Sequence, residues 1–201
     1  MNLIIGEIIA DFSECKIDGN SFYQESFSGS IIDFAETLKE GGKDFEIVTK
    51  LGSDKLAKTE ENAIYELYRK DMKYSISSPY LSPVAIDGDL RLKSTAVATI
   101  STEELEFTIQ PLKPTSILLS GALLSLNPSG SAIVDCLCFL DQRPKVFIDL
   151  MAEASFYYSM EILKKNVDTL SATLDTYLLG DVVSSEKAKR IEKSHLCDYL
   201  E

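Results

Sequence analysis

The chain has 201 residues, of which 45% are hydrophobic, and its 20 lysines and arginines against 32 aspartates and glutamates give a formal net charge of −12. This length is enough for one large domain, and this hydrophobic share supports a buried core and argues against disorder. Binding to duplex nucleic acid needs clustered cations, so this acidic balance leads us to expect no nucleic-acid partner.

The sequence also argues against secretion and against a membrane span. No apolar run approaches the roughly 20 residues that a membrane-spanning helix needs. The N-terminal stretch MNLIIGEIIADF has no basic leader and contains two acidic residues, which is typical of a buried strand rather than a signal peptide. None of the four cysteines forms a C-x-x-C pair, which favours structural thiols in a reducing compartment. We therefore expect a cytoplasmic protein.

Two contrasting segments open the chain. Residues 2–10 form a nearly continuous apolar run, which is typical of a strand buried on both faces. Residues 13–27 are polar and irregular, and a D-G-N turn is predicted at 18–20. We expect a core strand followed by a surface segment.

A helix is predicted next. Its apolar positions recur with helical spacing: Ile31, Phe34, Ala35 and Leu38. Ser28 or Ser30 can cap its first turn, because a serine oxygen accepts a hydrogen bond from a free backbone N–H. Gly41 or Gly42 can adopt the left-handed conformation that ends a helix.

The rest of the chain alternates between predicted strands and predicted helices. The strands are 45–52, 116–121, 145–149 and 174–179, and the helices are 54–70, 129–141, 159–166 and 184–200. Such alternation is typical of an α/β fold with a mostly parallel sheet and helices on both faces.

Residues 74–100 interrupt this alternation. They are rich in serine, proline and β-branched residues, and a D-G-D turn at 87–89 separates two short apolar stretches, which predicts a hairpin. This segment and residues 13–27 can pair as a small separate sheet.

Two features of the sequence could point to enzyme chemistry, a near-match to a phosphate-binding loop and a histidine, but neither supports it. The stretch GSDKLAKT at 52–59 nearly matches a phosphate-binding loop, but Ala57 stands where that loop needs a second glycine. An ordinary helix start with an acidic cap is the favoured interpretation. His195 is the only histidine, which excludes a catalytic triad with histidine and a site with several histidine ligands.

Two aspartates follow or end predicted strands. Asp11 closes the N-terminal apolar run, and Asp149 lies at the end of KVFID. Ligand sites of open parallel sheets form beyond the carboxyl ends of the strands, where a carboxylate can accept hydrogen bonds from the hydroxyls of a polyol. The alternative is that each aspartate caps a local turn. Position alone leaves both interpretations open for Asp11 and favours the turn for Asp149.

Several stretches of the chain match the signatures of one known family. Residues 6–12, GEIIADF, are similar to a G-E-x-x-x-D-F opening, and KLGSDKLAK is similar to a K-L-G-x-D-x-x-G segment. Four small residues also fall in register with the first signature of the family: Gly29, Ala35, Gly42 and Gly52. In that signature Ser28 replaces a glycine and Asp33 replaces an asparagine. The sequence thus resembles the amino-terminal part of the PfkB-type, or ribokinase-like, carbohydrate kinases, in the fructokinase and ketodeoxygluconate kinase branch.

The resemblance implies a fold, an activity and a binding site. The fold would be ribokinase-like, with a β-sheet lid made from segments about 13–27 and 74–100 that closes over the sugar. The activity would be transfer of a phosphoryl group from ATP, with magnesium, to a sugar hydroxyl. The implied sugar-binding residues are Asp11, Gly29 and Asp33, and Asp149 matches the first residue of a D-P-N-x-R stretch.

The chain departs from the family in two places that matter for catalysis. No arginine follows Asp149 in DLMAE, and the G-A-G-D motif that supplies the catalytic base is absent from the 201 residues. We therefore expect a single truncated domain over 1–201, without the C-terminal nucleotide-binding part, that is inactive alone. We assign no catalytic and no metal-binding residue. The alternative function is a non-catalytic sugar-binding or dimerisation module derived from a sugar kinase.

An open sheet edge is expected after the strand at 174–179. Unpaired edges recruit partners unless another segment covers them, and the predicted helix at 184–200 can cover only part of this one. We therefore expect a homodimer, formed through this edge or through the lid strands.

Overall fold

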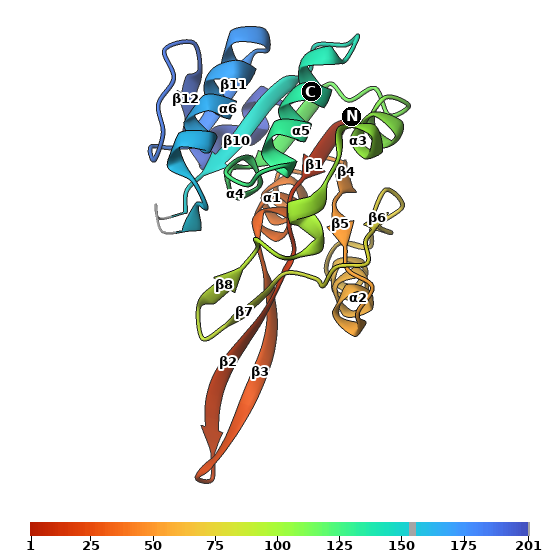
Figure 1. Cartoon of the computed structure of the whole chain (residues 1–201), viewed down its shortest axis with the longest axis vertical. Helices are drawn as coiled ribbons and strands as arrows, with labels where there is room; N and C mark the ends of the chain where they lie inside the picture. Colours follow the sequence, from red (N-terminus) through yellow and green to blue (C-terminus); the bar gives the residue numbers. More distant parts are fainter. Residues whose placement is uncertain (153–155, 201) are drawn as a thin grey trace.

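The structure of the protein is a computed structural model that describes residues 1–152 and 156–200. Among these residues a six-stranded, wholly parallel sheet has the order β12-β11-β10-β9-β1-β4 (Figure 1). Its strands are β1 (Asn2–Ile5), β4 (Phe45–Val48), β9 (Ser116–Ser120), β10 (Lys145–Leu150), β11 (Thr176–Gly180) and β12 (Lys189–Ile191). The predicted α/β fold with a parallel sheet is confirmed.

Helices cover both faces of this sheet. They are α1 (Ser30–Glu40), α2 (Lys55–Tyr68), α3 (Thr102–Ile109), α4 (Gly121–Leu124), α5 (Ser129–Phe139), α6 (Met160–Thr173) and α7 (Leu196–Tyr199), with 3-10 turns η1 (Ala96–Thr99) and η3 (Lys193–His195). Because successive strand residues face opposite sides, Leu3 packs in one buried cluster with α3, α5 and α6, whereas Ile4 packs in the other with α1 and α7. Among the described residues no helix is long and apolar enough to cross a membrane.

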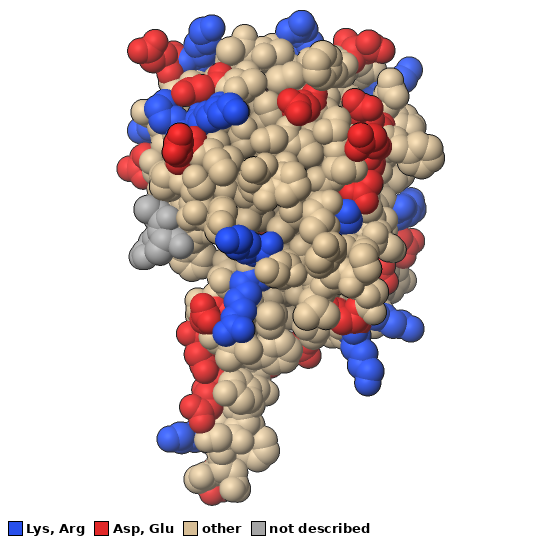
Figure 2. All heavy atoms as spheres, in the orientation of Figure 1, with Lys and Arg blue, Asp and Glu red and all other residues tan. Residues whose placement is uncertain are grey.

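A second, four-stranded sheet projects from the main body. Its order is β3-β2-β7-β8, with β2 (Ile9–Ile17), β3 (Asn20–Ser28), β7 (Val84–Ile86) and β8 (Asp89–Arg91). We call the hairpin of β2 and β3 the arm; acidic side chains gather along one side of it (Figures 1 and 2). Its turn places Asp18 and Gly19 at positive φ, 51° and 82°. This sheet contains strands from both segments that were expected to pair, but β2 meets β7 at residues 10–12, just before the predicted segment 13–27, and the role of the sheet as a lid stays a prediction.

Several predicted boundaries are wrong. A continuous apolar run does not indicate where the chain leaves one sheet and enters another. The run at 2–10 is divided between β1 and β2, with a link at Gly6–Ile8. The polar segment 13–27 is not irregular but belongs to the two strands of the arm. The predicted strand 45–52 is likewise divided, and β5 (Lys50–Leu51) pairs with β6 (Ile76–Ser77) in a third sheet.

The predicted helix at 184–200 is also wrong. It contains β12, η3 and the short helix α7 instead. β12 pairs in parallel with β11, and Leu196 is fully buried against the sheet. The sheet edge expected beyond β11 is therefore paired, because ladder hydrogen bonds and burial outweigh the helical propensity of this charged segment.

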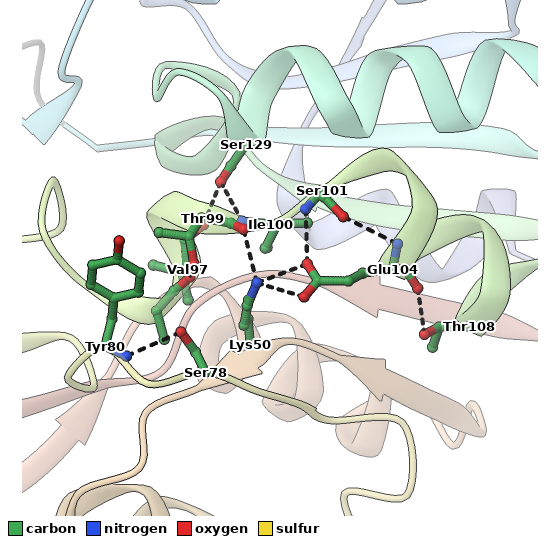
Figure 3. Close-up of polar contacts among 11 residues, drawn as sticks. Lys50, Ser78, Tyr80, Val97, Thr99, Ile100, Ser101, Glu104, Thr108 and Ser129 are labelled. Atoms are coloured by element: carbon green, nitrogen blue, oxygen red, sulfur yellow. Dashed lines mark hydrogen bonds and ion pairs between the residues drawn. The ribbon is translucent and has the colours of Figure 1, made fainter.

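A polar network connects the third sheet to α3, the helix that follows residues 74–100 (Figure 3). Lys50 in β5 donates to the carbonyl of Thr99 at 2.8 Å and to both carboxylate oxygens of Glu104 at 2.7 and 2.8 Å. Glu104 also forms a capping box with Ser101 at the start of α3. Ser129 of α5 accepts a hydrogen bond from the N–H of Ile100 at 3.0 Å. The end of η1 is therefore bonded to β5 through Lys50 and to α5 through Ser129.

Candidate functional site

A cavity of about 310 Å³ lies where the carboxyl ends of three core strands meet the second sheet. Its floor comes from the residues at or just after the ends of β1, β9 and β10, and Leu90 of β8 contributes to its wall. This is the position at which open parallel sheets bind ligands.

Three of the four predicted site residues line this cavity. They are Gly29 before α1, Asp33 in its first turn and Asp149 near the end of β10. Asp11 is not among the lining residues; it lies further along β2, beyond Ile9, and pairs with Ser26 and Ala85. The fold thus brings together residues that are far apart in the sequence, although their role in binding stays a prediction.

The start of α1 requires glycine at position 29. Gly29 has φ of 103°, and a Cβ atom there would lie 2.5 Å from the carbonyl oxygen of Glu7. The predicted serine caps are wrong, because no side chain of the Ser28–Ser30 stretch caps this helix. Instead Glu7 accepts the N–H of Ser30 on Oε1 at 3.1 Å and the N–H of Ile31 on its carbonyl at 3.3 Å. The helix is capped by a residue from the link between two strands.

Glu7 is the site residue that the sequence reasoning missed. Its side chain lines the cavity although the residue is only 4% exposed, and its Oε2 has no hydrogen-bond partner among the described residues. Burial raises the pKa of Glu7, and the nearby hydroxyls of Ser120 and Ser30 lower it only in part. Its only sequence signal was its place in the GEIIADF opening, which does not state whether a carboxyl points inward.

Asp149 both caps a local turn and lines the cavity. Its Oδ1 accepts the N–H of Met151 at 2.9 Å, so the local turn that the sequence favoured is present. It also lines the cavity, where burial raises its pKa, Lys193 lowers it and Asp33 raises it. Gly121 packs against this point, since a Cβ atom there would lie 2.3 Å from the Asp149 carbonyl oxygen. The close approach of the two strand ends depends on that glycine.

Tyr157 separates this cavity from a larger one. It lines both, together with Leu90 and Phe156, and the second cavity has a volume of about 680 Å³. Tyr157 is 7% exposed, and its hydroxyl has no hydrogen-bond partner among the described residues. Burial raises the pKa of Tyr157 well above its ordinary value, and Asp149 and Glu7 raise it further.

The stretch that resembles a phosphate-binding loop forms an ordinary helix start, as favoured from the sequence. Asp54 caps α2 by accepting the N–H of Ala57 at 3.1 Å. Gly52 is packed against the neighbouring segment, where a Cβ atom would lie 2.4 Å from the backbone nitrogen of Ser82. The four cysteines are free thiols, and His195 is exposed.

No family model and no curated protein matches this sequence. Solved structures do match its fold. The PfkB protein of Polaromonas sp. has a TM-score of 0.69 at 13% identity, over 89% of this chain and 64% of that one. A fructokinase of Xylella fastidiosa with bound ATP has 0.70 at 12%, over 89% and 58%. The 2-dehydro-3-deoxygluconokinase of Thermotoga maritima has 0.71 at 16%, over 88% and 59%.

These likenesses cover most of this chain but a smaller share of its structural neighbours. The chain spans about three-fifths of the length of those solved structures, between 58% and 64% in the three cases. At identities of 12–16% the likeness establishes architecture rather than activity. The described part of the chain has the ribokinase-like α/β fold of the PfkB-family sugar kinases.

Proposed function

We propose that this chain binds a small sugar in the 310 Å³ cavity, as the sugar-binding part of a PfkB-type carbohydrate kinase that phosphorylates a sugar hydroxyl from ATP. One observation carries the proposal: Gly29, Asp33 and Asp149, from separate parts of the chain, line one cavity at the carboxyl ends of the core strands. Carboxylate oxygens accept hydrogen bonds from hydroxyl groups, and Ile9, Ser28 and Leu90 of the second sheet contribute to the lining.

The 201 residues alone are expected to bind sugar without transferring phosphate. Their sequence has no G-A-G-D motif, which supplies the catalytic base in the family that the chain resembles. Among the described residues no three His, Cys, Asp or Glu side chains come together in a group that could hold a metal ion. ATP and magnesium therefore belong to the proposed kinase as a whole.

A non-catalytic sugar-binding module is the second candidate. It is favoured by Asp33 and Ala57, which stand where the family has asparagine and glycine. Incubation with sugar and magnesium-ATP tests the expectation, common to both candidates, that these residues transfer no phosphate by themselves. Sugar phosphate formed by these 201 residues would show that they carry their own catalytic groups, contrary to our expectation for the chain alone.

Sugar binding is tested by calorimetry with fructose, ribose and ketodeoxygluconate. Asp33→Ala and Asp149→Asn are expected to weaken the binding of whichever sugar is bound by about 10-fold or more, because a hydrogen bond to a charged acceptor is worth about 1.5–3 kcal/mol. Asp71→Asn, an exposed change outside the cavity, is the matched control and should bind like the wild type. Asp11→Asn tests the remaining candidate separately. Equal affinities in all variants would contradict the site.

We also propose that two copies of the chain associate through the arm. β3 is an edge strand of the second sheet, and the arm exposes large apolar side chains, with Ile17 at 57%, Phe22 at 50% and Tyr23 at 60%. Light scattering should give the mass of a dimer for the wild type and of a monomer for Phe22→Ser with Tyr23→Ser. Phe107→Ser, at an exposed position on α3, should leave the dimer intact. A wild type that is monomeric at all concentrations would exclude this proposal.

A further inference from the structure

The cavity carries acidic groups without compensating cations. Of the described residues that line it, three have carboxyl groups, namely Glu7, Asp33 and Asp149, and none is a lysine, arginine or histidine. Lys193 lies close enough to Asp149 to lower its pKa, but it is not a lining residue. A ligand in this cavity therefore meets three carboxyl groups and no cationic side chain among the described lining residues.

Three buried polar groups along the cavity lack hydrogen-bond partners among the described residues. They are Oε2 of Glu7, which is 4% exposed, Oγ of Ser30, which is 6% exposed, and the hydroxyl of Tyr157, which is 7% exposed. Buried polar atoms without hydrogen bonds are costly and are uncommon in folded proteins outside functional sites. A polar ligand in this cavity lies beside all three groups and can complete their hydrogen bonds.

The spacing of the carboxyl groups favours a molecule over an ion. Although three of them line one cavity, the described residues contain no group of three or more acidic, histidine or cysteine side chains that could hold a metal. The lining of the same cavity also contains large apolar and aromatic side chains, Leu90, Phe156 and Tyr157. Aromatic rings pack well against the C–H face of a sugar ring and attract cations.

Resting on the sugar-binding function proposed above, we propose that the preferred ligand is an amino sugar, whose protonated amino group lies in the cavity lined by Glu7, Asp33 and Asp149. An ammonium group offers three donors and a positive charge, which matches an unpaired carboxylate oxygen and an acidic lining. A sugar acid or a sugar phosphate would bring a further negative charge to carboxyl groups that have no cation between them, so it is disfavoured.

Calorimetry at low ionic strength with glucosamine, glucose, N-acetylglucosamine and gluconate tests the inference. Glucosamine is expected to bind about 10-fold or more tighter than glucose, N-acetylglucosamine no tighter than glucose, and gluconate weakest. The advantage of glucosamine should shrink as salt is added, because screening weakens charge attraction. Glucosamine binding no tighter than glucose, or gluconate binding tightest, overturns the inference and leaves the sugar-binding proposal standing.

Substitution of a carboxyl group by an amide tests the effect of charge at nearly constant side-chain shape. Glu7→Gln should reduce glucosamine to the affinity of glucose, but Glu7 also caps α1 and this variant can fail to fold. Asp33→Asn changes an exposed position and is expected to fold, so it provides a second test. It should lower glucosamine binding more than glucose binding. Asp71→Asn should change neither. If none of these ligands binds, and fructose, ribose and ketodeoxygluconate do not bind either, the proposed function fails with the inference.

Discussion

Replacing Glu60 by glutamine is expected to remove most of the loss of stability that the wild type shows between about pH 5 and pH 8. Glu60 in α2 is fully buried, and neither of its carboxylate oxygens has a hydrogen-bond partner among the described residues. Burial raises its pKa from 4.5 to about 8, Ser82 lowers it in part, and Asp54 raises it further. Glu60 is therefore protonated in the folded protein at neutral pH.

The sign of the effect follows from where the proton is held more tightly. The folded state keeps the Glu60 proton up to about pH 8, whereas the unfolded chain releases it near 4.5. Stability therefore falls as pH rises between these values and is level above them, by about 4–5 kcal/mol in all for a gap of this size. Urea unfolding at about pH 5 and pH 9 should show this loss in the wild type and not in Glu60→Gln.

An exposed residue of the same helix provides the control for this measurement. Glu66→Gln removes a carboxyl that does not act on the pKa of Glu60, and it should keep the pH dependence of the wild type. An identical pH dependence for Glu60→Gln and the wild type would falsify the assignment of a protonated Glu60 at neutral pH.

Glu104→Gln is expected to lower the free energy of unfolding by about 3 kcal/mol at neutral pH, and Lys50→Met by only about 1 kcal/mol. The two partners of this ion pair differ in exposure: the side chain of Lys50 is 7% exposed and that of Glu104 is 32% exposed. Removing the carboxylate leaves a buried cation that water cannot reach. Removing the lysine leaves a carboxylate that can be rehydrated and keeps its hydrogen bond from the N–H of Ser101.

Urea denaturation of both variants at pH 7 measures the difference. Glutamine at position 104 can still accept a bond from Lys50 and cap α3, so the comparison isolates the charge. Glu106→Gln, an exposed change on the same helix, should be close to neutral. Equal losses for Glu104→Gln and Lys50→Met would show that the pair behaves like a surface ion pair.

The sequence predicted the layers of the fold better than its connections. The apolar runs at 116–121 and 145–149 are strands buried on both faces, and burial of such runs depends little on distant residues. The division of residues 2–10 was not predictable, because Gly6–Ile8 is as apolar as its neighbours apart from one glutamate. Which sheet a strand joins is decided by partners far along the chain, such as the pairing of Ala10 with Val84.

The candidate site shows the same limit. Family signatures brought out Gly29, Asp33 and Asp149 together, and the backbone at Gly29 explains why that position needs glycine. Glu7 could not be placed from the sequence, since the donors that it caps belong to a helix more than twenty residues away. Residues 184–200 have the charge pattern of a surface helix, and only the neighbouring β11 makes part of them a strand.

The position of Glu7 in the link between β1 and β2 has a mechanical consequence. β1 is paired between β9 and β4 in the main sheet, whereas β2 is the first strand of the projecting arm. Only Ile8 separates the start of β2 from Glu7, so a displacement of the arm is transmitted directly to the carboxyl that caps α1. Thermodynamic linkage is reciprocal. If a molecule bound by that carboxyl restrains the arm, restraint of the arm strengthens binding of the molecule by the same free energy.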